Sequence, residues 1–162
     1  MTRKHLFLLC SHISVFVAGG MLGIYLLPII IAPGAPERNE LIAFADNAVY
    51  SASLDKGLKG SDWLHWADGQ VYISPGAIAF LGKLAPGPDY KLYLTPKLVT
   101  DKKDFLSIKN HSVMIGDIRT FDNFIVSVPA SVDIHQYPAL LIWCEAFNQF
   151  ISAGLYRPEL QK

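Results

Sequence analysis

The sequence predicts an all-β fold, an antiparallel β-sandwich or barrel-like domain, behind a single N-terminal transmembrane helix. From Ala48 onward, short apolar runs alternate with Gly, Pro, Asp and Asn roughly every 8–12 residues, which is typical of sandwiches and barrels. No long pattern of period 3.6 appears in this part. Ahead of it, residues 6–32 form an apolar stretch without a charge. At 162 residues, the chain has room for one domain of ordinary size and an accessory segment.

The stretch 6–32 is long enough to cross a bilayer, since about 20 apolar residues span the hydrocarbon core. Arg3 and Lys4 precede it, and by the positive-inside rule they keep residues 1–5 in the cytoplasm. The domain behind the helix is then periplasmic or extracellular, and residues 6–32 make the lipid bilayer a partner of the chain. A cleaved signal peptide is the alternative. Its apolar core is normally about 7–15 residues, so the longer stretch favours an uncleaved signal-anchor.

The segments after the anchor follow from changes in composition. Residues 33–47 carry prolines among alanines and are expected to be a linker or a short helix. The β domain is expected over residues 48–158, and residues 159–162 form a C-terminal tail. Residues 100–109 mix lysines with aspartates and are expected to be a solvated loop.

Eight short apolar runs are the expected strands of the domain. They cover residues 63–66, 70–74, 77–81, 90–95, 112–118, 123–128, 139–144 and 147–155. The Asp68-Gly69 dipeptide between the first two predicts a hairpin turn there. A short helix over residues 145–151 is an alternative that periodicity leaves open.

Charge and motifs exclude several classes of function. The 14 basic residues balance the 14 acidic ones, so no basic stripe predicts a nucleic-acid partner. The sequence contains no nucleophile elbow, phosphate-binding glycine loop or zinc-protease motif. The chain therefore has no hydrolase, kinase or nucleotide-binding signature, and whether it is an enzyme stays open.

Cys144 is the principal candidate for chemistry. It ends the most apolar run of the domain, and Cys10, the other cysteine, lies inside the predicted anchor, so the two cannot form an intramolecular bridge. Strand alternation places Cys144 on one face of its strand, and Trp143 and Glu145 on the other. A single thiol outside the cytoplasm is unusual. It is buried, paired with another chain, bound to a cofactor, or chemically active as a redox centre, and the pattern leaves these interpretations open.

His65 is the second candidate, because it lies between Trp63 and Trp66. Aromatic surroundings formed by these two side chains and Trp143 could hold a cofactor, which the sequence does not identify. A half-exposed histidine packed by aromatic rings is the simpler interpretation. No histidine spacing outside the anchor predicts a metal site, and a site made of His65, His135 and Cys144 would need distant strands to converge.

Four motifs follow one another along the domain: WLHWADGQVYI at 63–73, GPDYKLYL at 87–94, IGDI at 115–118 followed by Phe124 and Val128-Pro129, and IWCEAFN at 142–148. In this order they resemble one known family, the DM-thirteen domain, also called the electron-transfer DM-thirteen domain, over roughly residues 58–156. The resemblance implies an all-β extracytoplasmic domain in which the cysteine of the last motif is a suspected redox centre.

Together these patterns lead to two hypotheses. The first is a membrane-anchored extracytoplasmic β domain with a redox or electron-transfer role, in which Cys144 is the redox thiol, His65 a nearby partner, and a redox or membrane protein a further partner. The alternative is a non-enzymatic module that binds a ligand or protein at the cell surface, with Cys144 purely structural.

Overall fold

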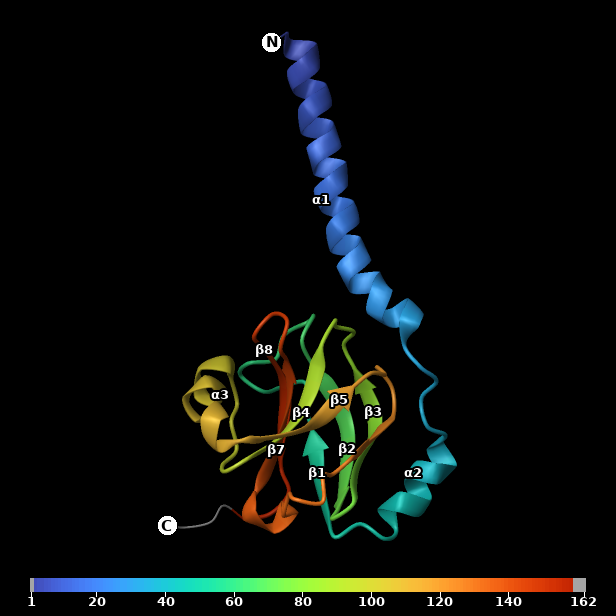
Figure 1. The fold of residues 1–162 in the computed structure, drawn as a ribbon, viewed down its shortest axis with the longest axis vertical. Coiled ribbons are helices and arrows are strands. Elements are labelled where there is room, and N and C mark those ends of the chain that lie inside the picture. Colours follow the sequence, from blue (N-terminus) through green and yellow to red (C-terminus); the bar gives the residue numbers. More distant parts are fainter. Residues whose placement is uncertain (1, 159–162) are drawn as a thin grey trace.

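A computed structural model describes residues 2–158 of the chain (Figure 1). It begins with the long helix α1 (Arg3–Ile31), which projects away from the β domain, and continues through the short helix α2 (Arg38–Ala45). Among the described residues, α1 alone is long and apolar enough to cross a membrane, a property that a signal sequence would share. None of its residues is buried. Helix α2 confirms the prediction of a short helix within 33–47.

The described part of the β domain consists of two antiparallel four-stranded sheets, and the prediction of an antiparallel, mostly β domain is confirmed. One sheet has the strand order β1-β2-β3-β6 and the other β5-β4-β7-β8. The strands are β1 (Tyr50–Leu54), β2 (Ala67–Ser74), β3 (Ala77–Leu84), β4 (Tyr90–Thr95), β5 (Val113–Ile118), β6 (Phe124–Ser127), β7 (Ala139–Cys144) and β8 (Gln149–Leu155). This two-layer arrangement favours the sandwich alternative over a closed barrel.

The main core lies between the two sheets, where apolar side chains of both meet. It includes Val71, Ile73, Ile78 and Phe80 from one sheet and Leu92, Leu94, Leu140, Ile142 and Cys144 from the other. A second, smaller cluster lies on the outer face of the β5-β4-β7-β8 sheet, around Trp143 and Phe150. Strand β7 is therefore buried on both faces, and all six of its residues are buried. This explains why its sequence is a continuous apolar run.

The predicted strand at 63–66 with a hairpin turn at Asp68-Gly69 is wrong. Residues 63–66 form a loop, and β2 runs without interruption from Ala67 through both turn-like residues. Gly69 pairs with Gly82 of β3 at a point where the strands approach closely. A Cβ atom at Gly69 would lie 2.7 Å from the Gly82 Cα. This glycine thus marks a close approach of two backbones instead of a turn.

The predicted solvated loop at 100–109 is also wrong, because residues Lys102–Ile108 form helix α3, followed by the short 3-10 helix η1 (Lys109–His111). Asp101 caps α3 by accepting a hydrogen bond from the Asp104 amide at 2.9 Å. The charged residues flank two apolar side chains that contact the second cluster, Phe105, which is fully buried, and Ile108, which is partly buried. Two such contacts in a helix of 7 residues are too few to give a clear periodic signal.

Two further differences concern the ends of the domain. Strand β1, with the sequence YSASL, was not predicted because its small polar residues give little apolar signal. At the other end, residues 145–148 form a turn into β8, so the helix alternative over 145–151 is wrong and the strand is confirmed. Asn148 closes this turn with a positive φ of 47°. A second 3-10 helix, η2 (Ile134–Gln136), precedes β7.

Candidate functional site

Cys144 is the last residue of β7, and it lies opposite Tyr90 of β4 and Gln149 of β8. Its side chain belongs to the core between the sheets, together with Leu140 and Ile142, as strand alternation predicts. Only 2% of Cys144 is exposed. The thiol thus lies at the end of the core nearest the turn between β7 and β8.

The thiol lines a cavity of about 370 Å³ between this end of the β domain and α1. The domain contributes Cys144, His65, Tyr90 and Phe147, and α1 contributes the turn around Ile24. The wall is mostly apolar, and His65 is the only histidine among the residues that line it. The structure therefore brings together the two residues that the sequence singles out for redox chemistry, Cys144 and His65.

Burial raises the pKa of the Cys144 thiol above its ordinary value, because the charged form loses contact with water. The backbone amides of Phe147, Asp89 and Ala146 act in the opposite direction, and the Asp89 carboxylate adds to the increase. The Glu145 side chain lies on the other face of the strand, where it pairs with Lys109. At neutral pH the resting state of Cys144 is therefore the protonated thiol.

His65 is held by Asp62 from its own loop. The imidazole Nδ1 lies 2.9 Å from Asp62 Oδ2, and the same carboxylate accepts a hydrogen bond from the Leu64 amide at 2.7 Å. Burial alone would raise the pKa of Asp62, but the hydrogen bonds from His65 and Leu64 outweigh it and lower the pKa. The Asp62 carboxylate thus stays ionised and fixes the orientation of the ring beside the cavity.

The three tryptophans predicted as aromatic surroundings do not lie around one point. Trp63 is 83% exposed in the loop before β2, and the Trp66 ring lies under Lys56, whose Nζ is 3.8 Å from the ring centroid. Trp143 is fully buried on the opposite face of β7 from Cys144. Trp63 and Trp66 therefore lie in the His65 loop, whereas Trp143 is separated from it by the sheet.

A cluster of charged and aromatic side chains on the outer face of β7 was not found by sequence reasoning. Glu145 accepts hydrogen bonds from the Tyr93 hydroxyl and, at 2.7 Å, from Lys109 Nζ. The ammonium group lies 5.6 Å from the centroid of the Trp143 ring, which packs against Phe105 at 4.8 Å. Strand alternation pairs Glu145 with Trp143, but no local spacing connects either of them to Lys109.

The charges of this cluster balance each other. Burial would raise the pKa of Glu145, but hydrogen bonds from Lys109 and Tyr93 outweigh it and hold the pKa below its ordinary value. The pKa of the Tyr93 hydroxyl is raised by burial and by its hydrogen bond to Glu145. The Trp143 Nε1 is buried and makes no hydrogen bond within the described residues, although the indole lies near enough to lower the Glu145 pKa slightly.

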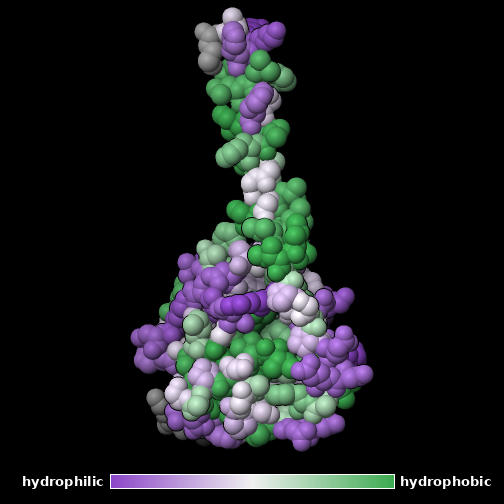
Figure 2. Space-filling view, turned by 45° about the vertical axis from the view of Figure 1, so that its right-hand side comes forward, coloured by the Kyte–Doolittle hydropathy of each residue, from purple (hydrophilic) through white to green (hydrophobic). Residues whose placement is uncertain are grey.

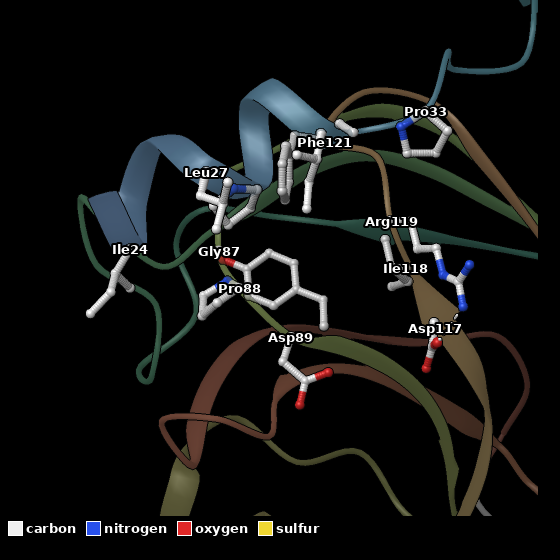
Figure 3. A pocket seen from close by; sticks show the side chains of 14 residues that line it. Ile24, Leu27, Pro33, Gly87, Pro88, Asp89, Asp117, Ile118, Arg119 and Phe121 are labelled. Carbon is white, nitrogen blue, oxygen red and sulfur yellow. Dashed lines mark hydrogen bonds and ion pairs between the residues drawn. The ribbon is translucent and has the colours of Figure 1, made fainter. Parts of the chain in front are cut away.

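A second cavity, of about 680 Å³, adjoins the first and shares Gly87 and Pro88 with it (Figure 3). Its wall toward α1 is apolar and includes Ile24 and Leu27, whereas β5 contributes Asp117 and the residues after β5 contribute Arg119. Arg119 Nη2 lies 3.0 Å from Asp117 Oδ2, so this charged pair is already satisfied. Tyr90 lines both this cavity and the one at Cys144.

His135 lies away from these cavities. Its Nδ1 is 2.8 Å from the Tyr50 hydroxyl, at the end of the domain where β7 begins instead of the end where Cys144 lies. A joint site of His65, His135 and Cys144 is therefore absent. Within residues 2–158, no three His, Cys, Asp or Glu side chains are grouped closely enough to hold a metal ion.

Comparison with known families adds one decisive observation to this geometry. The family model described as Electron transfer DM13 matches residues 60–155. The chain belongs to the DM13 family. The match includes Cys144, His65, Tyr90 and the outer cluster of β7, and it excludes α1, so the DM13 domain supplies the thiol wall of the cavity and the apolar helix closes it. No curated protein and no solved structure matches the chain.

Proposed function

We propose that this DM13 protein is a membrane-anchored, extracytoplasmic redox or electron-transfer module whose reactive centre is Cys144, with His65 as its partner. One observation carries the proposal. In a chain of an electron-transfer family, the thiol and an oriented imidazole line the same cavity. Family membership supplies the class of function, and the cavity provides a place where a second reactant meets the sulfur.

The chemistry needs a second sulfur or a cofactor, because one thiol cannot complete a disulfide cycle alone. Cys10 is too distant to be that second sulfur. It lies on α1, 11 residues before Met21 of the cavity wall, which is about 16 Å along a helix axis. The step we propose is attack of the Cys144 thiolate on a disulfide of a partner protein. The S–S bond of the partner breaks, one of its sulfurs forms the mixed disulfide with Cys144, the other is released as a thiolate on the partner, and the proton of Cys144 passes to His65.

His65 is given the role of base because burial keeps the Cys144 thiol protonated at rest. An imidazole oriented by an ionised carboxylate is suited to take up such a proton. Trp63 and Trp66, in the same loop, are proposed as aromatic surroundings for a cofactor whose identity is unknown. Trp143 would not contact this cofactor, and its only link to the thiol is strand β7, which it shares with Cys144.

Helix α1 supports the anchoring part of the proposal. It is long and apolar enough to span a membrane, and Arg3 and Lys4 at its start orient it with the N-terminus in the cytoplasm. The DM13 domain then faces the periplasm or the cell exterior, where disulfides persist. The partners of the chain are the bilayer, through residues 6–32, and a redox or membrane protein.

The test is the reactivity of Cys144 in the intact membrane. In a Cys10→Ser background, we expect N-ethylmaleimide, a small uncharged thiol reagent, to modify Cys144 in the folded chain, and His65→Ala to slow the modification. Trapping of mixed disulfides should recover a partner with Cys10→Ser but none with Cys144→Ser. If Cys144 reacts only after unfolding in urea and no mixed disulfide is trapped, the redox role is wrong.

The alternative is a non-enzymatic binding module in which Cys144 only packs. The burial of the thiol and its raised pKa favour this function. It predicts that Cys144→Ala lowers stability but leaves the proteins captured by the chain from membrane extracts unchanged. Visible absorbance of the purified full chain separates the two functions further, because a haem or copper–thiolate centre is coloured and a packed thiol is not.

A further inference from the structure

The end of the DM13 domain that carries the Cys144 cavity exposes large apolar side chains. Trp63 is 83% exposed, Phe147 54% and Leu64 38%. They come from the loop before β2 and from the turn between β7 and β8, and Leu64 and Phe147 also line the cavity beside α1. These three residues are called the apolar tip below. Leu64 and Phe147 thus lie beside α1, which projects from one end of the domain (Figure 1) and is largely hydrophobic on the face that Figure 2 shows.

The register of α1 in a bilayer places this tip at a definite depth. If the hydrocarbon core begins at Leu6, just after Arg3 and Lys4, about 20 residues cross it, so its far boundary lies near Tyr25. Met21, Ile24 and Tyr25 are the α1 residues that line the Cys144 cavity. The part of the domain that contacts them therefore lies at the level where the acyl chains end and the headgroups begin.

The opposite end of the domain has a different surface. Arg157 donates a hydrogen bond to the His135 carbonyl, the His135 ring meets the Tyr50 hydroxyl, and the Asp133 carboxylate accepts from the His135 amide. These groups suit contact with water. Leu155 is 42% exposed at this end too, so the apolar tip is distinguished by its two aromatic rings and by its place beside α1.

We propose that the apolar tip is a docking surface for the bilayer, with Trp63, Leu64 and Phe147 inserted in the interfacial region of the outer leaflet. Aromatic side chains are favoured at this depth because the ring is apolar and the indole N–H reaches the headgroups. The inference rests on the proposed anchor, but not on the reactivity of Cys144. It places the Cys144 cavity at the membrane surface, so that a reactant reaches the thiol from the lipid side.

The experiment measures Trp63 directly in the full chain. The protein is placed in phosphatidylcholine vesicles whose acyl chains carry bromine, which quenches tryptophan emission at short range. We expect emission of the wild type to be quenched, and Trp63→Phe to lose most of the quenchable part. Trp143 serves as an internal reference, since it is fully buried in the domain.

A matched control moves the tryptophan to the other end of the domain. In Trp63→Phe/Leu155→Trp, the new side chain occupies an exposed position at the end of β8, opposite Ala139. Emission should increase, but bromine should not quench the added part. Docking is overturned if bromine quenches the same amount of emission in wild type and in Trp63→Phe. It is also overturned if bromine quenches the tryptophan at position 155 as strongly as Trp63.

Alkaline carbonate extraction of the same vesicles separates the two levels of the argument. A chain that stays in the lipid while Trp63 is unquenched keeps the anchor and loses the docking surface. A chain that washes out overturns both. Neither result bears on the mixed disulfide of Cys144, which has its own test.

Discussion

The two faces of strand β7 are both buried, but they differ in how their polar atoms are satisfied. On the outer face, Glu145 is neutralised by Lys109 and hydrogen-bonded by Tyr93, and α3 covers the aromatic rings around them. On the inner face, Cys144 lies at the end of the core beside a cavity. One residue separates a partly exposed ionic cluster from a buried thiol beside a cavity.

Under the proposed function, a single strand would serve stability on one face and chemistry on the other. Alternation along a strand places neighbours on opposite faces, so each face acquires its own partners. The outer face contributes packing and a fixed ion pair, while the inner face keeps open space beside its last residue. Substitutions on the outer face should therefore alter stability, whereas those around the cavity should alter the reactivity of the thiol.

Trp143→Ala should have the largest effect on stability. The side chain is fully buried, and its removal would leave a cavity against Phe105. We expect a loss of about 3–5 kcal/mol in the free energy of unfolding. Urea unfolding of the full chain in detergent, followed by circular dichroism, measures it. Trp63→Ala is the control, because Trp63 is exposed and should change stability little; an equal loss in both variants would contradict this account.

Cys144→Ala should have a smaller effect, about 1–2 kcal/mol, because a small buried side chain is shortened at the edge of the core. The same unfolding measurement applies. Cys10→Ala is the matched control, since Cys10 is exposed on α1 and should leave the DM13 domain unchanged. A loss at Cys144 as large as that at Trp143 would show that the cavity-side face is as tightly packed as the outer face.

Glu145→Gln should cost about 1 kcal/mol at neutral pH, since the ion pair with Lys109 is partly exposed. The pKa of Glu145 is lowered in the folded chain, so its stabilisation is present above the ordinary value of 4.5 and is lost as the pH falls through the lower folded-state pKa. The stabilities of wild type and variant should therefore converge in acid. Arg119→Met, at the more exposed pair with Asp117, is the control. A difference in the free energy of unfolding between wild type and Glu145→Gln that stays constant from neutral pH into acid would contradict the prediction.

His65→Ala should have the smallest effect on stability, within about 0.5 kcal/mol, because the side chain is partly exposed and pairs only within its own loop. Its effect should instead appear as slower modification of Cys144 by N-ethylmaleimide. Asp62→Asn, which keeps the imidazole but weakens its orientation, should give an intermediate rate. Equal rates in all three proteins would remove His65 from the proposed chemistry.

The sequence alone was sufficient where the signal is local. The apolar N-terminal helix, the antiparallel strands from Ala77 onward and the assignment of Cys144 and Trp143 to opposite faces of one strand all follow from composition and alternation. The resemblance to the DM-thirteen domain, carried by four short motifs, is confirmed by the family match. In each case, neighbouring residues determine the result.

Tertiary structure decided what depends on residues far apart in the chain. Gly69 appeared to be a turn residue because its close approach to Gly82 is invisible locally. Helix α3 appeared to be a loop because Phe105 becomes an anchor only when Trp143 and Tyr93 meet it. The Glu145–Lys109 pair and the cavity shared by Cys144, His65 and α1 arise in the same way. Pairing between distant strands and helices creates these features, and no period within a short segment encodes them.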